Sequence, residues 1–173
     1  MAENLFDILM QMELQVSAGL NFELEKIEVI PELNEVGALY NQNCCNYILG
    51  DEGLKEDWPI AIQEMAFLAG TVAYYHYTEN KDKLLKDGIL QTYIGKYRNI
   101  YKIDKYFQEL YNMDDTSLEA MRVSFTILAG TMCSQVTELI KNKNIPGIQE
   151  AIPDLMMANY QFGINYGRHL LED

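Results

Sequence analysis

The sequence contains few of the residues that usually build disulfide frameworks, since only three cysteines occur among its 173 residues. Cys44 and Cys45 are adjacent and cannot cross-link distant segments, and the third cysteine leaves an odd number. Free thiols in a reducing compartment are the simpler interpretation, so we expect a cytoplasmic protein. The apolar uncharged run from Val123 to Thr137 is too short to cross a bilayer, and no membrane partner is expected.

Motifs for nucleotide binding and nucleophilic catalysis are also absent from the sequence. It contains neither a GxGxxG loop nor a Walker loop, and no serine sits in a nucleophile elbow. Cys133 lies in an apolar stripe typical of a core, and Cys44 and Cys45 have no basic residue within one helical turn to lower a thiol pKa. We therefore assign no catalytic residues and no cofactor, and we favour a protein that is not an enzyme.

The sequence has only two histidines, and each is followed three residues later by a glutamate: His76 by Glu79, and His169 by Glu172. This spacing puts both side chains of a pair on one helix face, so either pair can supply two metal ligands. Helical di-iron sites use the reverse order, Glu-x-x-His, and the helix dipole favours a histidine near a carboxyl end without any metal. We predict no metal site, although the spacing leaves metal binding by these pairs open.

Basic residues are scarce outside one segment of the chain. The formal net charge is −13, from 26 acids and 13 bases. Residues 1–57 hold twelve acids and two bases, whereas residues 80–105 hold seven bases and three acids. The whole chain repels nucleic acid on average, so direct nucleic-acid binding is not expected. We expect the basic segment to meet the acidic one, within the chain or between subunits.

What the sequence does have is helical periodicity. Hydrophobic residues make up 49% of the chain and charged residues 23%, as in a folded globular domain. Apolar residues recur at helical spacing, and no segment is a convincing strand. We predict an all-α helical bundle of about six helices in a single domain over residues 1–173, with a hinge at residues 50–57. The helices are expected at residues 5–16, 31–50, 58–78, 89–110 (as one or two helices), 116–141 and 154–171.

Local signals place two of the helix starts. Residues 116–119, Thr-Ser-Leu-Glu, match a capping box, in which the threonine hydroxyl and the glutamate carboxylate bind free backbone N–H groups. Pro146, Gly147 and Pro153 are expected to interrupt the chain, so that the last helix begins near Asp154.

The tetrapeptide Leu-Ala-Gly-Thr occurs twice, at residues 68–71 and 128–131, each time inside an apolar helical segment. Glycine inside a helix costs about 1 kcal/mol relative to alanine, so its presence indicates another backbone passing close by. We predict that the two long central helices cross at these patches, within the chain or across a dimer axis. Gly163 and Gly167 would let the last helix join them. So short a match leaves open whether the repeat reflects a duplication.

The segment 91–107 interleaves tyrosines with basic residues. On a helix they form neighbouring stripes that can hold a phosphate while a ring stacks, or can form a polar-rimmed interface. An amphipathic helix with a tyrosine-rich core face and solvated lysines is the structural alternative. The candidate ligand- or partner-binding residues are Tyr93, Lys96, Tyr97, Arg98, Tyr101, Lys102 and Lys105.

Three functions are compatible with this sequence. The favoured one is a non-enzymatic adaptor or regulatory protein with an acidic surface, expected to form a homodimer, because its twelve tyrosines and nine methionines suit adaptable interfaces. The second is a small-anion or nucleotide binder that uses the tyrosine- and lysine-rich segment. The third is an acidic inhibitor or nucleic-acid mimic of immunity type, indicated only by size and acidity.

Overall fold

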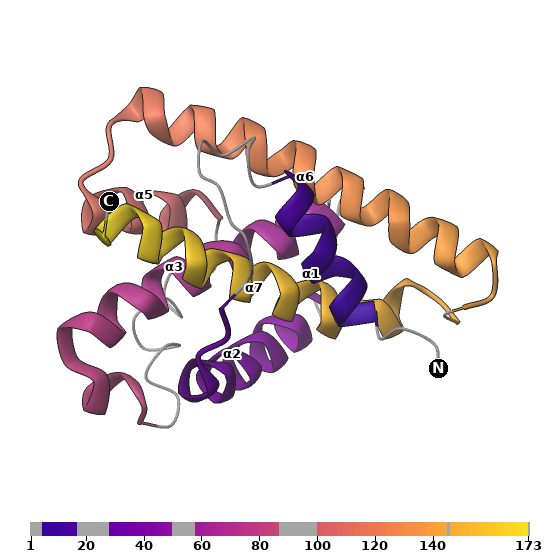
Figure 1. Cartoon of the computed structure of the whole chain (residues 1–173), viewed down its shortest axis with the longest axis horizontal. Coiled ribbons are helices and arrows are strands. Elements are labelled where there is room, and N and C mark those ends of the chain that lie inside the picture. Colours follow the sequence, from indigo (N-terminus) through magenta and orange to yellow (C-terminus); the bar gives the residue numbers. More distant parts are fainter. Residues whose placement is uncertain (1–4, 17–27, 50–57, 87–99, 145, 173) are drawn as a thin grey trace.

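The computed structural model describes residues 5–16, 28–49, 58–86, 100–144 and 146–172 (Figure 1). These residues form six α-helices and no strand. The helices are α1 (Leu5–Val16), α2 (Pro31–Leu49), α3 (Trp58–Leu84), α5 (Ile100–Tyr111), α6 (Asp115–Lys141) and α7 (Ile148–Glu172). The predicted all-α bundle is therefore confirmed over these ranges, whereas the predicted hinge at residues 50–57 lies outside them.

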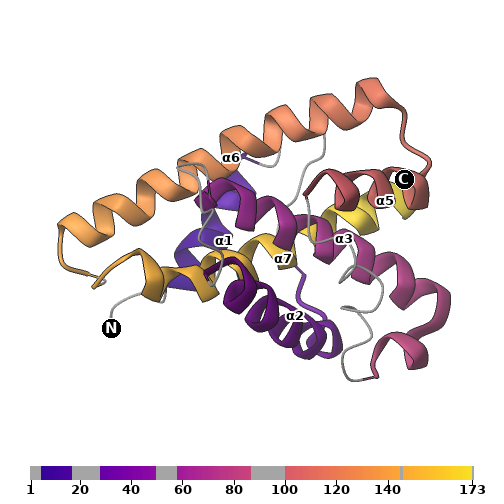
Figure 2. The ribbon, with the colours of Figure 1, turned by 180° about the vertical axis from the view of Figure 1, so that it is seen from behind.

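Helices α3 and α7 form the centre of the bundle. Figures 1 and 2 show them between α6 and α1 on one side and α2 on the other. One cluster of buried side chains, which includes Phe67 and Phe125, joins the central pair to α1 and α6. A second cluster, which includes Leu33 and Tyr160, joins the pair to α2. The central helices thus bury side chains on two sides, as the middle layer of a bundle must.

Glycines allow α3 and α7 to pack backbone against backbone. A methyl group added at Gly70 would overlap the carbonyl oxygen of Tyr160, and one added at Gly163 would overlap the carbonyl oxygen of Phe67. A methyl group at Gly167 would lie 3.2 Å from a Cα atom of α3. These overlaps confirm the predicted close approach of the last helix to the first copy of the repeated tetrapeptide.

The second copy of the tetrapeptide has different surroundings. Among the described residues, no atom lies within 4 Å of a methyl group added at Gly130. Helix α6 instead meets α3 through Phe125, whose ring stacks on Phe67 with the centroids 4.4 Å apart. The prediction that these two helices cross at both glycines within the chain is wrong, because large side chains hold their backbones apart.

An amide side chain in the core links three helices. Gln63 of α3 donates a hydrogen bond from Nε2 to the carbonyl oxygen of Ala129 at 3.4 Å and lies 3.0 Å from the Cys133 Sγ, both in α6. Its Oε1 atom accepts a hydrogen bond from Asn159 Nδ2 of α7 at 3.1 Å. Because all these contacts are directional, they fix how α6 is rotated about its own axis.

The start of α6 differs from the expected capping box. The helix begins at Asp115, and its cap is Asp114, whose carboxylate accepts a hydrogen bond from the Ser117 backbone N–H at 2.7 Å. The predicted cap at residues 116–119 is therefore two residues too late. An aspartate caps as well as a threonine, and its charge also interacts favourably with the helix dipole.

One helix begins earlier than predicted, and another ends later. Helix α7 begins at Ile148 rather than near Asp154, and it includes Pro153. Pro153 is the sixth residue of this helix, so the helix forfeits one backbone hydrogen bond there, and the buried side chains just before it offset that cost. Helix α3 runs on to Leu84 but breaks at Asn80, whose side chain accepts a hydrogen bond from a backbone N–H of the final turn.

The acidic and basic segments of the chain meet at one described ion pair. Lys81 Nζ lies 2.9 Å from the Glu32 carboxylate, which joins the end of α3 to the start of α2. Nearby, the Asn165 side chain accepts from the backbone N–H of Glu28 at 3.1 Å and donates to its carbonyl oxygen at 3.0 Å. Arg168 pairs with the carboxylate of the same glutamate. Residues 28–30, just before α2, are therefore held against α7.

Candidate functional site

Helix α6 lies along one edge of the bundle and turns one face away from it (Figures 1 and 2). The outward face includes Val123 and Ile127, whose exposed fractions are 53% and 68%. The opposite face holds the buried residues Met121, Phe125, Leu128, Ala129, Met132 and Val136. Helical spacing defines the outward face, called the outer strip below, as Ala120, Val123, Ile127, Gly130, Thr131, Ser134 and Thr137.

The outer strip is uncharged. Arg122 is the one charged residue between positions 120 and 137, and it does not lie on the strip. Its Nε atom lies 3.1 Å from a carboxylate oxygen of Glu64 and 3.2 Å from one of Asp104. A helix face that exposes two large aliphatic side chains and no charge over about 25 Å is typical of a surface that another molecule covers.

The hydroxyl groups of the outer strip already have acceptors. Thr131, Ser134 and Thr137 each donate to the backbone carbonyl oxygen four residues earlier, at 2.9 to 3.1 Å. A buried hydroxyl without a partner costs about 1 to 3 kcal/mol, and these bonds avoid that cost. A partner could therefore cover the strip without leaving these donors unsatisfied.

Within the described part of the chain, α6 is the one helix with the length and hydropathy of a membrane span. Of its most apolar window of 18 residues, 28% are buried in the bundle. The apolar content of α6 is thus divided between a core face, which Arg122 and Phe125 hold against α3, and the outer strip.

Beneath α6, two buried carboxyl groups share one arginine. Glu64 of α3 and Asp104 of α5 have side chains that are 9% and 5% exposed, and both face Arg122. Burial and the neighbouring Glu64 carboxylate raise the pKa of Asp104 to about 7. Burial also raises the pKa of Glu64, against the lowering effect of Arg122. Two acids facing one base therefore retain a proton up to about neutral pH.

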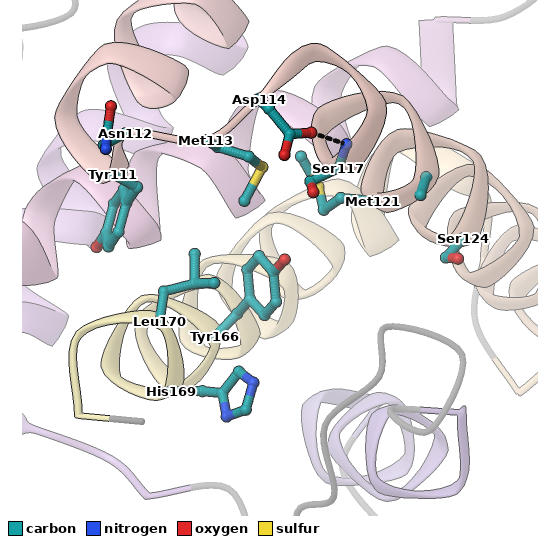
Figure 3. A pocket seen from close by; sticks show the side chains of 11 residues that line it. Tyr111, Asn112, Met113, Asp114, Ser117, Met121, Ser124, Tyr166, His169 and Leu170 are labelled. Atoms are coloured by element: carbon teal, nitrogen blue, oxygen red, sulfur yellow. Dashed lines mark hydrogen bonds between the residues drawn. The ribbon is translucent and has the colours of Figure 1, made fainter.

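Paired carboxyls with raised pKa values are also what acid–base catalysis uses. Here both groups lie inside the bundle, between α3, α5 and α6, and neither lines the pocket shown in Figure 3. Their geometry fits a structural contact that ties α5 to the other two helices. No pattern in the sequence marks this cluster, because its three members are far apart along the chain.

A pocket of about 420 Å³ opens between the start of α6 and the end of α7. Figure 3 shows Tyr166 and Leu170 projecting from α7 toward the side of α6 that carries Met121. Asp114 lies at its rim, but its carboxylate caps α6 by accepting from the Ser117 N–H. Burial raises the pKa of Tyr166 to about 12, so its phenol is neutral at physiological pH. The walls combine apolar side chains, such as Met121 and Leu170, with polar ones, such as Ser117.

The two histidines contact aromatic residues. His76 Nε2 lies 2.8 Å from the Tyr106 hydroxyl, and burial lowers the pKa of this histidine. The His169 ring stacks on Tyr166, while the nearby Glu172 accepts a hydrogen bond from a tyrosine of α3. Over the described ranges, no group of three histidine, cysteine or acidic side chains is placed to hold a metal ion.

The predicted tyrosine- and lysine-rich site lies mostly outside the described residues. Tyr101 and Lys102 belong to α5, but their side chains are not among those described, and Lys105 is exposed on the same helix. Ligand binding by this segment therefore stays a prediction. The residues that fall outside are Tyr93, Lys96, Tyr97 and Arg98.

The architecture defines this chain as an all-α bundle protein that exposes an apolar helix face. No protein-family model, curated protein or solved structure matches it. Its function must therefore be inferred from its own surfaces and contacts.

Proposed function

We propose that this chain is a non-enzymatic, cytoplasmic interaction protein, with an adaptor or regulatory role, that binds a protein partner through the outer strip of α6. The observation that carries the proposal is the exposure of Val123 and Ile127 on a helix face without charge. Burying apolar surface contributes about 25 cal/mol per Å², and interface centres are depleted in charge. The strip supplies both properties.

The surroundings of the strip favour specific over indiscriminate association. The chain carries a net charge of −13, which keeps copies and other acidic proteins apart in most orientations. Close approach costs least where charge is missing, and that condition is met on the outer strip. The acidic remainder of the surface thus helps to select how a partner docks.

The test places a photo-crosslinking amino acid at Ile127 of the full chain, in the cells that make it. We expect protein adducts from this position and none from the control position Asp82, which is exposed near the end of α3, away from α6. Adding Val123→Glu should abolish the adduct, because a buried unpaired charge is strongly unfavourable. Adding Thr78→Glu, a matched change at an exposed residue of α3, should leave it intact.

Two results would contradict the proposal. One is the absence of any protein adduct from position 127. The other is an adduct whose yield does not change when Val123→Glu is introduced, because such contacts do not depend on the apolar character of the strip.

A further inference from the structure

We propose that the partner of the outer strip is a second copy of this chain, whose α6 packs antiparallel against the first about a two-fold axis near residue 128. The inference rests on the proposed function above and names its partner. An isologous contact of this kind uses the same surface on both copies, so the strip must be complementary to itself.

The charges at the two ends of the outer strip give this self-complementarity. The amino end of α6 carries Asp115 and Glu119, and its carboxyl end carries Glu138 and Lys141, followed by Lys143. All five side chains are exposed, so the amino end carries a charge of −2 and the carboxyl end a charge of +1. An antiparallel pair places each acidic end against the basic end of the other copy, whereas a parallel pair would place like charges together.

Lys141 can make this contact although it already has a partner. Its Nζ lies 3.0 Å from a carboxylate oxygen of Glu138 in the same chain, yet the two side chains remain 66% and 60% exposed. An exposed ion pair of this kind rearranges at little cost. The antiparallel arrangement also opposes the two helix dipoles, which is the favourable orientation for neighbouring helices.

The shape of the strip matches the same arrangement. Ile127 is its most exposed large side chain, and three residues later the space above Gly130 holds no described atom within 4 Å of a Cβ position. The point midway between them coincides with the middle of α6. A two-fold axis there sets Ile127 of each copy over Gly130 of the other. It also sets Val123 opposite Ser134 and Glu119 opposite Glu138. Lys141 is then within one turn of Glu119 and 3.0 Å from Glu138, where it can lie between the two carboxylates.

Other occupants fit these features less well. A helix that lies on a membrane carries bases along its polar face, whereas α6 has acids at its amino end and the chain has a net charge of −13. An unrelated protein would have to reproduce both the central contact, in which Ile127 lies over Gly130, and the opposite charges at the two ends. A second copy supplies them by symmetry.

The size of the strip sets the expected affinity. A helix of the length of α6 is about 40 Å long, and a contact about 10 Å wide would cover roughly 400 Å² on each copy. Stable complexes bury about 800 Å² on each partner. We therefore expect a weak dimer with a dissociation constant in the micromolar range, which depends strongly on its central residues.

The first experiment is sedimentation equilibrium of the purified full chain at concentrations from about 1 to 500 μM. We expect reversible dimerisation, and Ile127→Glu should raise the dissociation constant by about 100-fold or more. The matched control is Val29→Glu, at an exposed valine outside α6, which should leave the constant unchanged. Both substituted side chains are solvent-exposed, and circular dichroism melts check that each variant is folded.

The second experiment tests the orientation with charge reversals. Every chain in this series carries Glu138→Gln, which removes the carboxylate opposite Glu119. On that background Glu119→Lys and Lys141→Glu should each raise the dissociation constant about fivefold, and combining them should restore the starting value within about twofold. In a parallel dimer each reversal would leave like charges facing one another, as before, and would not weaken association. Single reversals that bind as well as the Glu138→Gln chain would therefore overturn the antiparallel arrangement.

The remaining outcomes separate this inference from the proposed function. A chain that stays monomeric, or a dimer unaffected by Ile127→Glu, overturns the second copy as partner. If a monomeric chain crosslinks from position 127 to a different protein, the proposed function survives alone. If the chain instead floats with phosphatidylcholine vesicles, and Ile127→Glu stops it, both are overturned in favour of a membrane surface.

Discussion

Replacing Asp104 by asparagine should make the protein more stable at pH 8 and leave its stability at pH 5 nearly unchanged. Asparagine resembles the protonated aspartic acid in size and charge. At pH 5 the Asp104 carboxyl holds its proton in the folded state, because burial and the Glu64 carboxylate raise its pKa to about 7. The variant therefore copies the form already present at that pH, in which Arg122 still faces Glu64.

The sign of the effect follows from proton linkage. An unfolded aspartate ionises near pH 3.9, so between about pH 4 and 7 the folded state of the original chain binds one more proton than the unfolded state. Stability contributed by this proton is fully present below the unfolded pKa and is lost as the pH rises through the folded pKa. The free energy of unfolding of the original chain should thus fall from pH 5 to 8 through Asp104. The asparagine variant should not show this contribution to the fall.

The magnitude can be worked from the same shift. Each pH unit in the window contributes at most about 1.4 kcal/mol, so the interval from pH 5 to 7 gives an upper limit of about 2.7 kcal/mol. The attraction of Arg122 is already part of this shift, and nearby water screens part of the remaining cost. We therefore expect the variant to exceed the original chain by about 2 kcal/mol in unfolding free energy at pH 8.

The assay is urea unfolding followed by circular dichroism at pH 5, 6, 7 and 8, with both chains at a low concentration that keeps them monomeric. Burial lowers the pKa of His76, which gives stability the opposite pH dependence in this window, but the histidine is common to both chains and cancels in their difference. Asp82→Asn, at an exposed site, is the control and should show no pH-dependent difference. A difference between Asp104→Asn and the original chain that is the same at pH 5 and pH 8 would refute the reasoning.

Three further predictions concern stability, each measured by thermal or urea unfolding of the monomer. Gly70→Ala should destabilise by about 2 to 3 kcal/mol because its methyl group meets the α7 backbone, whereas Gly130→Ala should stabilise by up to about 1 kcal/mol. Equal effects of the two would contradict the different surroundings of the repeat. Tyr160→Phe should cost about 1 to 2 kcal/mol, since its hydroxyl donates to the buried carbonyl oxygen of Leu33 at 2.8 Å. Asn165→Ala should cost a similar amount by freeing the segment before α2, and an unchanged midpoint would show that those bonds contribute nothing.

Helical periodicity was enough to predict the all-α bundle, because amphipathic helices record in the sequence which face they bury. The cost of a helical glycine also predicted a close approach at Gly70, and Gly163 and Gly167 were recognised as its counterparts. The same reasoning failed for Gly130. A glycine indicates that a side chain is missing, but the sequence does not say which neighbour, if any, occupies that side.

The candidate site was less accessible from the sequence. The uncharged run from Val123 to Thr137 was visible, but it divides into a core face and the outer strip only when α6 is rotated correctly against α3. The buried cluster of Glu64, Asp104 and Arg122 depends on three helices meeting, and no local pattern marks such residues. Ordinary surface acids and bases have the same sequence signature.

The hydrogen bonds of Gln63 have a consequence for the surface of the molecule. The amide is completely buried, and its Nε2 atom donates to a backbone carbonyl oxygen of α6. Its Oε1 atom accepts a hydrogen bond from Asn159 of α7. A backbone group cannot change its angular position without turning the whole helix. This buried amide therefore determines which side of α6 faces solvent. The composition of that exposed surface depends on a residue in the core.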